Sequence, residues 1–265
     1  MEIQTVNSKP GADALAGTSK KGGFSLLRLV KRLVIALPIV VMLIVFANWL
    51  WLISGSNRWD LKIDKNGTQV YTMKTPGSES LRIRAVTQSR EFSMSNIIAP
   101  ALDESIANDC SKWVAGCQSY KILTPWDPRR LNNVTMWTIK LFPPFKPREM
   151  LLQNQVHVDP VTRVVTLESL AVPNHLPPDN CCVRLEHAHN VWRYTPMPDG
   201  SIQVELLYDL DMGGFFPQIL LNLGAPSQLY TELTEHNPAM LRQEKYRNAH
   251  FDFLDPATSG VNAAN

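Results

Sequence analysis

The sequence predicts an α+β fold in which a curved antiparallel sheet grips a long C-terminal helix, preceded by one transmembrane helix. Three observations lead to this prediction. No ionisable side chain occurs between Arg32 and Arg58. Apolar and polar residues then alternate between repeated turn signals, which is the period of strands joined in hairpins. A helical period dominates again only after Gly213, near the end of the chain.

The first element is the uncharged stretch, whose core runs from Leu33 to Ile53. At the rise of an α-helix, this segment can cross a hydrocarbon layer of about 30 Å. Its uniformly apolar composition argues against an amphipathic core helix. A cleaved signal peptide is the alternative, since small residues follow at 54–56, but such a peptide has a shorter apolar region of about 7–15 residues. We therefore expect an uncleaved anchor over residues 33–53.

The charges on either side of the anchor predict its orientation. Basic residues gather between positions 20 and 32, whereas basic and acidic residues are interleaved over 58–65. The positive-inside rule places the N-terminus in the cytoplasm and the C-terminal domain in an extracytoplasmic space, the periplasm if the cell is bacterial. Residues 1–32 then form a basic cytoplasmic tail, of which residues 1–19 have a composition typical of disorder.

The exported part begins with three predicted strands. Residues 59–63 alternate in strand fashion, and Asn66-Gly67 is a strong hairpin signal because both positions accept positive φ. The chain returns as a second strand over 69–73, and alternation over 81–86 predicts a third.

A helical segment follows, because apolar residues between positions 94 and 106 recur mostly at three- and four-residue steps. The next region, which contains Trp113 and Trp126, is expected to be rich in loops. About six strands then resume, separated by turn pairs such as Asp159-Pro160 and Asp199-Gly200. The clearest of these strands are predicted at 134–139, 150–158, 161–167, 183–194 and 202–208.

The last predicted element is a long helix, for which Pro217 suits the first turn. Pro226 is expected to bend or split it. The stripe predicted to be buried consists of Ile219, Leu220, Leu223, Leu229 and Leu233. An apolar helix after a curved sheet packs across the concave face and encloses an apolar space, where ligand pockets form. Residues 243–265 are expected to form a polar, less ordered tail.

Three segments together carry a resemblance to a known family. They are the hairpin WDLKIDKNGTQVYTM from Trp59, the stretch PPFKPRE at 143–149, and residues 183–217, which end in DLDMGGFFP. In order and spacing they resemble the START family, the steroidogenic-acute-regulatory-related lipid-transfer domains. The resemblance covers about residues 57–242. Glu149, where the family more often has Asp, and the N-terminal anchor, which many members lack, depart from the pattern.

The resemblance implies a helix-grip fold with an internal cavity for one hydrophobic ligand, typically a sterol, a phospholipid or another lipid. The C-terminal helix and nearby loops would gate this cavity. The leading hypothesis is therefore a membrane-anchored domain that binds, and can transfer, a hydrophobic molecule. The alternatives are a helix-grip enzyme of cyclase type, which would need a titratable cluster in its cavity, and a ligand-free interaction scaffold.

The ligand-binding candidates belong to the cavity that this fold implies. Arg184 and Glu186 are two apart on a predicted strand and so share a face, where they could hold a polar headgroup. An ion pair on the solvent face is the favoured alternative. Arg148 matches the family's arginine, and it could orient a ligand or attach a loop to the sheet. The apolar candidates are Phe215, Phe216, Ile219, Leu220 and Leu223.

Other site chemistry finds little support in the sequence. Cys110 and Cys117 could form a disulfide across a turn, whereas the adjacent Cys181 and Cys182 are hard to join. No catalytic motif is present in the sequence, and His187-x-His189 lacks further ligands, so we predict no catalytic residue, no metal and no cofactor. A net charge of +2 gives no reason to expect a nucleic-acid partner, and no protein partner is predicted.

Overall fold

The computed structural model describes residues 26–114, 116–214 and 216–254. The chain divides into two compact units, residues 1–49 and residues 50–265. Most of the predicted cytoplasmic tail and the end of the predicted C-terminal tail lie outside the described residues, as does the ligand candidate Phe215.

The described residues of the first unit belong to the helix α1, Leu26–Ile53, which continues through Pro38 and ends in the second unit. Its segment Val34–Ile53 has a mean hydropathy of 2.4, and its side chains are almost all exposed. By length and composition this helix can cross a membrane. The finding is compatible with the predicted anchor, and the membrane orientation stays a prediction.

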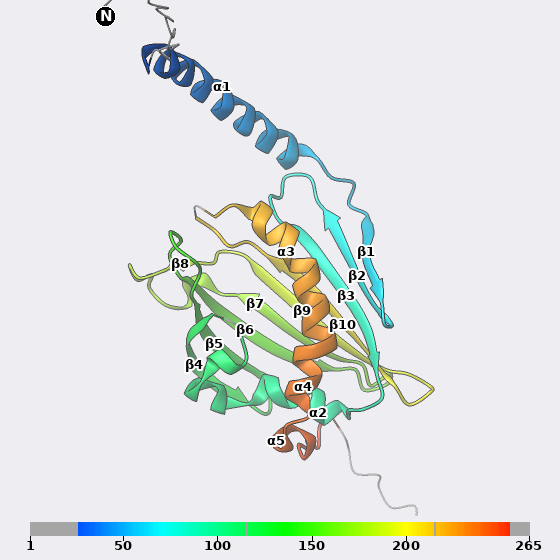
Figure 1. Cartoon of the computed structure of the whole chain (residues 1–265). Helices are drawn as coiled ribbons and strands as arrows, with labels where there is room; N and C mark the ends of the chain where they lie inside the picture. The colour runs from blue at the N-terminus through cyan, green and yellow to red at the C-terminus, as the bar shows by residue number, and fades with distance from the viewer. Residues whose placement is uncertain (1–25, 115, 215, 255–265) are drawn as a thin grey trace, which may run out of the picture. The chain divides into compact units, whose positions relative to one another are not determined.

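The second unit is built on one ten-stranded sheet (Figure 1). The strands follow the order β1-β2-β3-β10-β9-β7-β6-β5-β4, with antiparallel neighbours throughout this path. The short β8 pairs in parallel with β6. The strands are β1 Trp59–Lys65, β2 Thr68–Lys74, β3 Leu81–Ser89, β4 Cys117–Asp127, β5 Asn132–Ile139, β6 Arg148–Val158, β7 Val165–Ala171, β8 Val183–Arg184, β9 Ala188–Pro196 and β10 Ile202–Leu210.

One long C-terminal helical run crosses a face of this sheet (Figure 1). We call the face toward this run the inner face. The run consists of α3 Gln218–Thr231, a π-helical turn Glu232–His236 and α4 Asn237–Leu241. The other helical segments are α2 Met94–Ile98, α5 Glu244–Arg247 and short 3₁₀ turns at Ala99–Leu102, Glu104–Asn108, Cys110–Lys112 and Pro173–His175. The predicted architecture, a sheet gripping a C-terminal helix, is confirmed.

The main core lies between the helical run and the inner face. Ile83, Val165 and Leu206 contribute from three strands, and Leu229 contributes from α3. The alternate residues of these strands point to the other face, where Arg82 of β3 pairs with Asp209 of β10 at 2.7 Å. The period of two therefore separates an apolar inner face from a charged outer face.

The buried side of α3 differs from the predicted one. Leu229 and Leu233 are buried as expected, but Ile219, Leu220 and Leu223 are 63%, 46% and 73% exposed. Polar side chains take the buried positions of the first turns: Gln218 and Asn222. Asn222 Oδ1 accepts a hydrogen bond from the Leu81 backbone N–H at 2.9 Å, and its Nδ2 donates to the Glu79 carbonyl at 3.0 Å. These bonds hold the polar side of the helix against the sheet and leave the apolar side outside.

Several predicted strands also have different limits. The region around Trp126, predicted as loops, contains β4, an edge strand that tolerates Pro125. The predicted strand over 183–194 is broken, because residues 185–187 separate β8 from β9. Helix α3 is not split at Pro226; it continues to Thr231.

The described part of the predicted C-terminal tail, residues 243–254, packs against the sheet domain. Tyr246 and Leu254 are 2% and 5% exposed. Lys245 contacts Asp103 at 2.6 Å, and the Tyr246 hydroxyl donates a hydrogen bond to the same carboxylate. Burial alone would raise the pKa of Asp103, but hydrogen bonds from Lys245, Ser105 and Tyr246 lower it to about 2. Contacts of the Lys245 and Tyr246 side chains with Asp103 therefore hold residues 243–254 against the domain.

All four cysteines form disulfides. Cys110 and Cys117 are joined, in agreement with the predicted local bridge. Cys181 and Cys182 are also joined, against our prediction, although they are adjacent in sequence. They lie in the loop before β8, where bends over both residues bring the two side chains together.

The packing of α3 yields a stability prediction. Leu229→Ala removes a side chain from the main core, and we expect it to lower the free energy of unfolding by about 2–5 kcal/mol. Leu223→Ala removes the same atoms from an exposed position, and we expect a change within about 0.5 kcal/mol. Chemical unfolding of the full chain in detergent would measure both. A larger loss for Leu223→Ala than for Leu229→Ala would contradict this orientation of α3.

Candidate functional site

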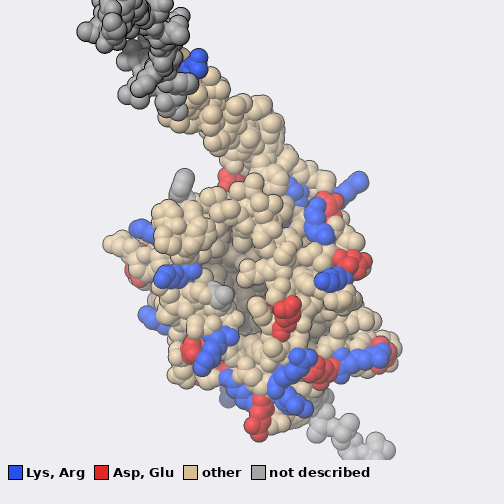
Figure 2. Space-filling model, viewed as in Figure 1, with Lys and Arg blue, Asp and Glu red and all other residues tan. Residues whose placement is uncertain are grey.

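The candidate site is a cavity of about 460 Å³ between α3 and the inner face, which we call the α3 cavity. Figure 2 shows this side of the molecule hollowed beside the helix, with charged side chains gathered toward the edges of the domain. The lining is mainly apolar, and its larger members are Ile139, Met150, Trp192, Leu206, Leu221 and Leu229. A volume and lining of this kind are typical of sites for hydrophobic small molecules.

The strand register explains how the lining forms. In the β9–β10 pair, Trp192 lies opposite Leu206, and Asn190 lies opposite Tyr208. Paired residues of an antiparallel ladder point to the same face, and alternate residues of each strand share it. All four side chains therefore enter the cavity from two neighbouring strands.

Six polar side chains also line the cavity: Lys140, Arg148, Asn190, Tyr208, Gln228 and Glu232. Burial raises the pKa of the Tyr208 hydroxyl to about 12, so this group stays protonated at neutral pH. Burial also raises the pKa of the Glu232 carboxyl, and His236, whose ring nitrogen lies 3.4 Å away, opposes this effect in part. The cavity is thus apolar along its length, with polar groups on β9, β10 and the helical run.

Arg148 holds the loop between β10 and α3 in place. Its guanidinium donates hydrogen bonds to the carbonyl oxygens of Lys146, Met212 and Gly213, at 2.6, 2.7 and 3.2 Å. The side chain borders the α3 cavity, and these carbonyls take up three of its five N–H donors. Of the two roles considered for Arg148, the structure shows the attachment of a loop to the sheet.

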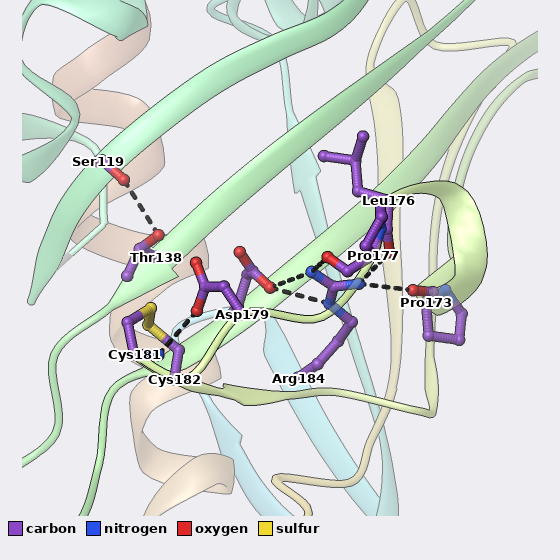
Figure 3. Close-up of polar contacts among 10 residues, drawn as sticks. Ser119, Thr138, Pro173, Leu176, Pro177, Asp179, Cys181, Cys182 and Arg184 are labelled. Atoms are coloured by element: carbon purple, nitrogen blue, oxygen red, sulfur yellow. Dashed lines mark hydrogen bonds and ion pairs between the residues drawn. A yellow bond between two sulfur atoms is a disulfide. The ribbon is translucent and has the colours of Figure 1, made fainter.

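Arg184 and Glu186 do not line the α3 cavity. Arg184 pairs with Glu149 at 2.7 Å, and both side chains are at least 90% buried. The Arg184 guanidinium also donates to the carbonyls of Pro173, Leu176 and Pro177, as Figure 3 shows. Glu149 lies next to Arg148 on β6, so the two point to opposite faces of the sheet. The pair therefore fixes the loop that contains Pro173, Leu176 and Pro177 on the side away from the cavity.

Glu186 has a different environment from the one we expected. It lies in the bend between β8 and β9, and it is exposed. The premise that it shares a strand face with Arg184 is therefore wrong, because the strand ends at Arg184.

The apolar candidates divide into two groups. Phe216 is half-buried and lies outside the lining, with its ring 5.2 Å from that of Phe145 and 5.6 Å from the Arg148 guanidinium carbon. Ile219, Leu220 and Leu223 are exposed on α3 and lie outside the lining, so the prediction that they contact a ligand inside the cavity is not supported. Their exposed surface is considered again below.

Sequence reasoning missed most of the residues that do line the cavity. Trp192 and Leu206 were placed on strands but not on the inner face, because the period of two does not reveal which face is inner. Asn190 and Glu232 looked like ordinary surface residues. The alternation along β9 could have identified Asn190. Ala188, Trp192 and Tyr194 lie at every second position from it, so all four side chains share the inner face.

Two other features were considered as sites. A second pocket of about 340 Å³, near the β1–β2 turn, is lined largely by polar residues such as Thr68, Thr87 and Asn237. Among the described residues, Asp179, Cys181 and Cys182 are close enough to share a metal ion, but the two sulfur atoms are joined in the disulfide and offer no thiolate. His187 and His189 contact separate carboxylates, Asp209 and Glu168.

Comparison with known proteins supports the fold. No protein-family model matches the chain. An uncharacterised protein from Pseudomonas aeruginosa is 24% identical over 168 residues, which are 62% of this chain and 77% of that protein.

Solved structures provide a more detailed comparison. A fragment of the STAR-related lipid transfer protein from Xanthomonas axonopodis superposes with a TM-score of 0.59 and 21% identity, over 70% of this chain and 99% of that one. Human STARD10 gives a TM-score of 0.60 at 13% identity, over 73% and 77%. Human StAR-related lipid transfer protein 5 gives 0.53 at 15% identity, over 69% and 87%. The second unit thus has the START-type fold, as predicted; at these identities the likeness concerns the fold alone.

The raised pKa of Glu232 yields a prediction about pH. A carboxyl with a raised folded-state pKa binds a proton more readily when folded, so its contribution to stability is lost as the pH rises through that pKa. Glu232→Gln should therefore raise the melting temperature at pH 7, and the gain should shrink as the pH falls to the ordinary value of 4.5. Thermal unfolding monitored by circular dichroism measures this difference.

The matched control is Glu235→Gln, which changes an exposed carboxyl of the same π-helical turn. It should leave the melting temperature nearly unchanged at both pH values. If Glu232→Gln lowered the melting temperature at pH 7 by as much as at pH 4.5, burial would not be the cause of the shift.

Proposed function

Because the second unit has the fold of START-related lipid-transfer domains, we propose that the protein binds a hydrophobic molecule in the α3 cavity and exchanges it with the membrane that holds its anchor. The observation that carries this proposal is the apolar cavity between α3 and the inner face. Apolar ligand surface would leave water on entering it, which contributes roughly 25 cal/mol per Å². The solved START-type structures add support through their printed descriptions as lipid-transfer proteins.

The membrane part of the proposal rests on α1. If α1 spans the membrane in the orientation that the flanking charges predict, the second unit lies in the extracytoplasmic space, which is the periplasm in a bacterial cell. Residues 1–32, 33–53, 57–242 and 243–265 would then be the tail, the anchor, the lipid-binding domain and its C-terminal extension. The anchor would keep the domain at a high effective concentration near one lipid surface.

Contacts inside the second unit connect the end of this anchor to α3. The Trp51 indole N–H donates to the Glu79 carbonyl at 2.9 Å, and the Gly77 N–H donates to the Leu52 carbonyl at 2.7 Å. Glu79 is also the residue whose carbonyl accepts the Asn222 hydrogen bond from α3. The first turns of α3 and the last turn of α1 therefore share one acceptor.

The exposed side of α3 supplies the surface that would meet the lipid. Ile219, Leu220 and Leu223 form an apolar patch on the first turns of α3, which we call the α3 patch. Exposed apolar patches mark interaction surfaces. Because Asn222 attaches the same turns to the Glu79 carbonyl beside Trp51, we propose that the α3 patch contacts the bilayer in which the anchor lies. The cavity would then open close to its source of ligand.

Filling the cavity should abolish ligand uptake. We expect Leu221→Trp to block binding of radiolabelled oleyl alcohol by the full chain in nanodiscs, because Leu221 lines the cavity and is part of α3. The control is Leu170→Trp, which makes the same change at a residue that is 41% exposed and outside the lining. Equal uptake by both variants, with both melting cooperatively, would contradict the assignment of the cavity.

Removing the apolar side chains of the α3 patch should slow loading without changing the cavity. For the double variant Ile219→Ser, Leu223→Ser we expect the loading rate from vesicles to fall by roughly tenfold or more, since each buried side chain contributes about 1.5–3 kcal/mol. Stopped-flow loading of the full chain in proteoliposomes measures this rate. Val161→Ser, at a turn residue 87% exposed, should load at the wild-type rate. An unchanged rate in the double variant would contradict membrane contact by this patch.

A further inference from the structure

The polar part of the α3 cavity indicates which class of ligand it accepts. A row of polar side chains crosses the inner face of the sheet, one from each of four neighbouring strands. In this row Asn133 of β5 lies opposite Asn154 of β6, Asn154 lies opposite Ser169 of β7, and Ser169 lies opposite Asn190 of β9. Tyr208 of β10 continues the row from Asn190.

The first part of this row satisfies its own hydrogen bonds. Asn154 Nδ2 donates to Asn133 Oδ1 at 2.8 Å and to Thr135 Oγ1 at 3.1 Å. Ser169 Oγ donates to Asn154 Oδ1 at 2.7 Å. The network ends at Ser169, so Asn190 receives no hydrogen bond from Ser169, its neighbour in the row.

Asn190 is where the row reaches the cavity. Its Oδ1 is buried and has no hydrogen-bond partner among the described residues. A buried acceptor without a partner costs about 1–3 kcal/mol, so a group that donates to it would be favoured by a similar amount. Tyr208, directly opposite, also lines the cavity, and cross-strand neighbours lie about 4.5–5.5 Å apart at Cβ. One ligand group can therefore meet both side chains.

The charges around the cavity restrict the ligand further. The Arg148 guanidinium is already engaged by three carbonyl oxygens, and Lys140 is exposed at the rim. Glu232 adds a carboxyl to the lining. An anionic headgroup would thus meet the Glu232 carboxyl, and the one cation inside, Arg148, already has three of its five N–H donors bonded to backbone carbonyls, so the added charge would be poorly paired.

We propose that the α3 cavity selects a hydrophobic molecule that carries a neutral hydroxyl group, bound by the Asn190 amide and the Tyr208 hydroxyl, over one that carries a carboxylate or a phosphate. A hydroxyl fits this pair because it both donates and accepts, and so it suits either orientation of the amide. This inference rests on the proposed function, since it concerns the same cavity.

The test uses three probes with the same hydrocarbon chain. The full chain in nanodiscs is incubated with equal amounts of oleyl alcohol, methyl oleate and oleate, and the molecules that remain with the purified protein are counted by mass spectrometry. We expect the alcohol to exceed the ester by about tenfold, the effect of one hydrogen bond to a buried acceptor. Oleate should be the least abundant of the three.

The variant Asn190→Leu keeps the approximate size of the side chain and removes the amide. It should bring the alcohol and the ester to equal occupancy while total uptake persists. Asn248→Leu, at an exposed residue that follows α5 and lies outside the cavity lining, should keep the wild-type preference.

The outcomes separate the two proposals. Equal uptake of alcohol and ester by the wild type, or a preference for the alcohol that Asn190→Leu retains, would overturn the hydroxyl assignment and leave the lipid-binding function standing. A preference for oleate would also overturn it. Uptake of none of the probes by a protein that melts cooperatively would overturn the proposed function itself.

Discussion

The position of α3, and with it the cavity, depends on one buried guanidinium. Arg148 is 2% exposed, and it joins the start of β6 to the loop that leads from β10 into α3. A buried charge requires polar partners, and here backbone carbonyl oxygens replace the lost water. Two of those carbonyls belong to residues 212 and 213, where the chain leaves the sheet, and the third belongs to Lys146. The same contacts consequently fix where the helix begins and take up three of the five N–H donors of the arginine.

The general fold could be predicted from local signals. Hairpin dipeptides such as Asn66-Gly67, alternation along β10, and the late helical period each reflect short-range physics that the final structure keeps. The resemblance of residues 183–217 to START domains added the connection between the last strand and the helix. These signals are strong where one face of a strand is buried and the other meets water.

The details that the sequence does not reveal depend on long-range contacts. Hydrophobicity alone put Ile219 and Leu223 inside, whereas Asn222 is inside because two backbone groups of residues 79 and 81 need its amide. The burial of Arg184 could not be predicted for the same reason, because its partner Glu149 is 35 positions away. A partner supplied by a distant segment leaves no periodic trace in the sequence around either residue. Cavity residues are harder to predict from the sequence than core residues, because the polar residues among them resemble surface residues.

The π-helical turn Glu232–His236 sets the phase of the helical run. Leu229 and Leu241 are both buried although 241 − 229 = 12 positions separate them, which is about 3.3 turns of a regular α-helix. A π-helical turn takes up one extra residue, so the effective separation is close to three whole turns and both side chains face the sheet. Glu232, the first residue of this turn, lines the cavity. Deletion of one residue within this turn would therefore give a regular α-helix in which about three whole turns still separate the two leucines, so both would keep facing the sheet.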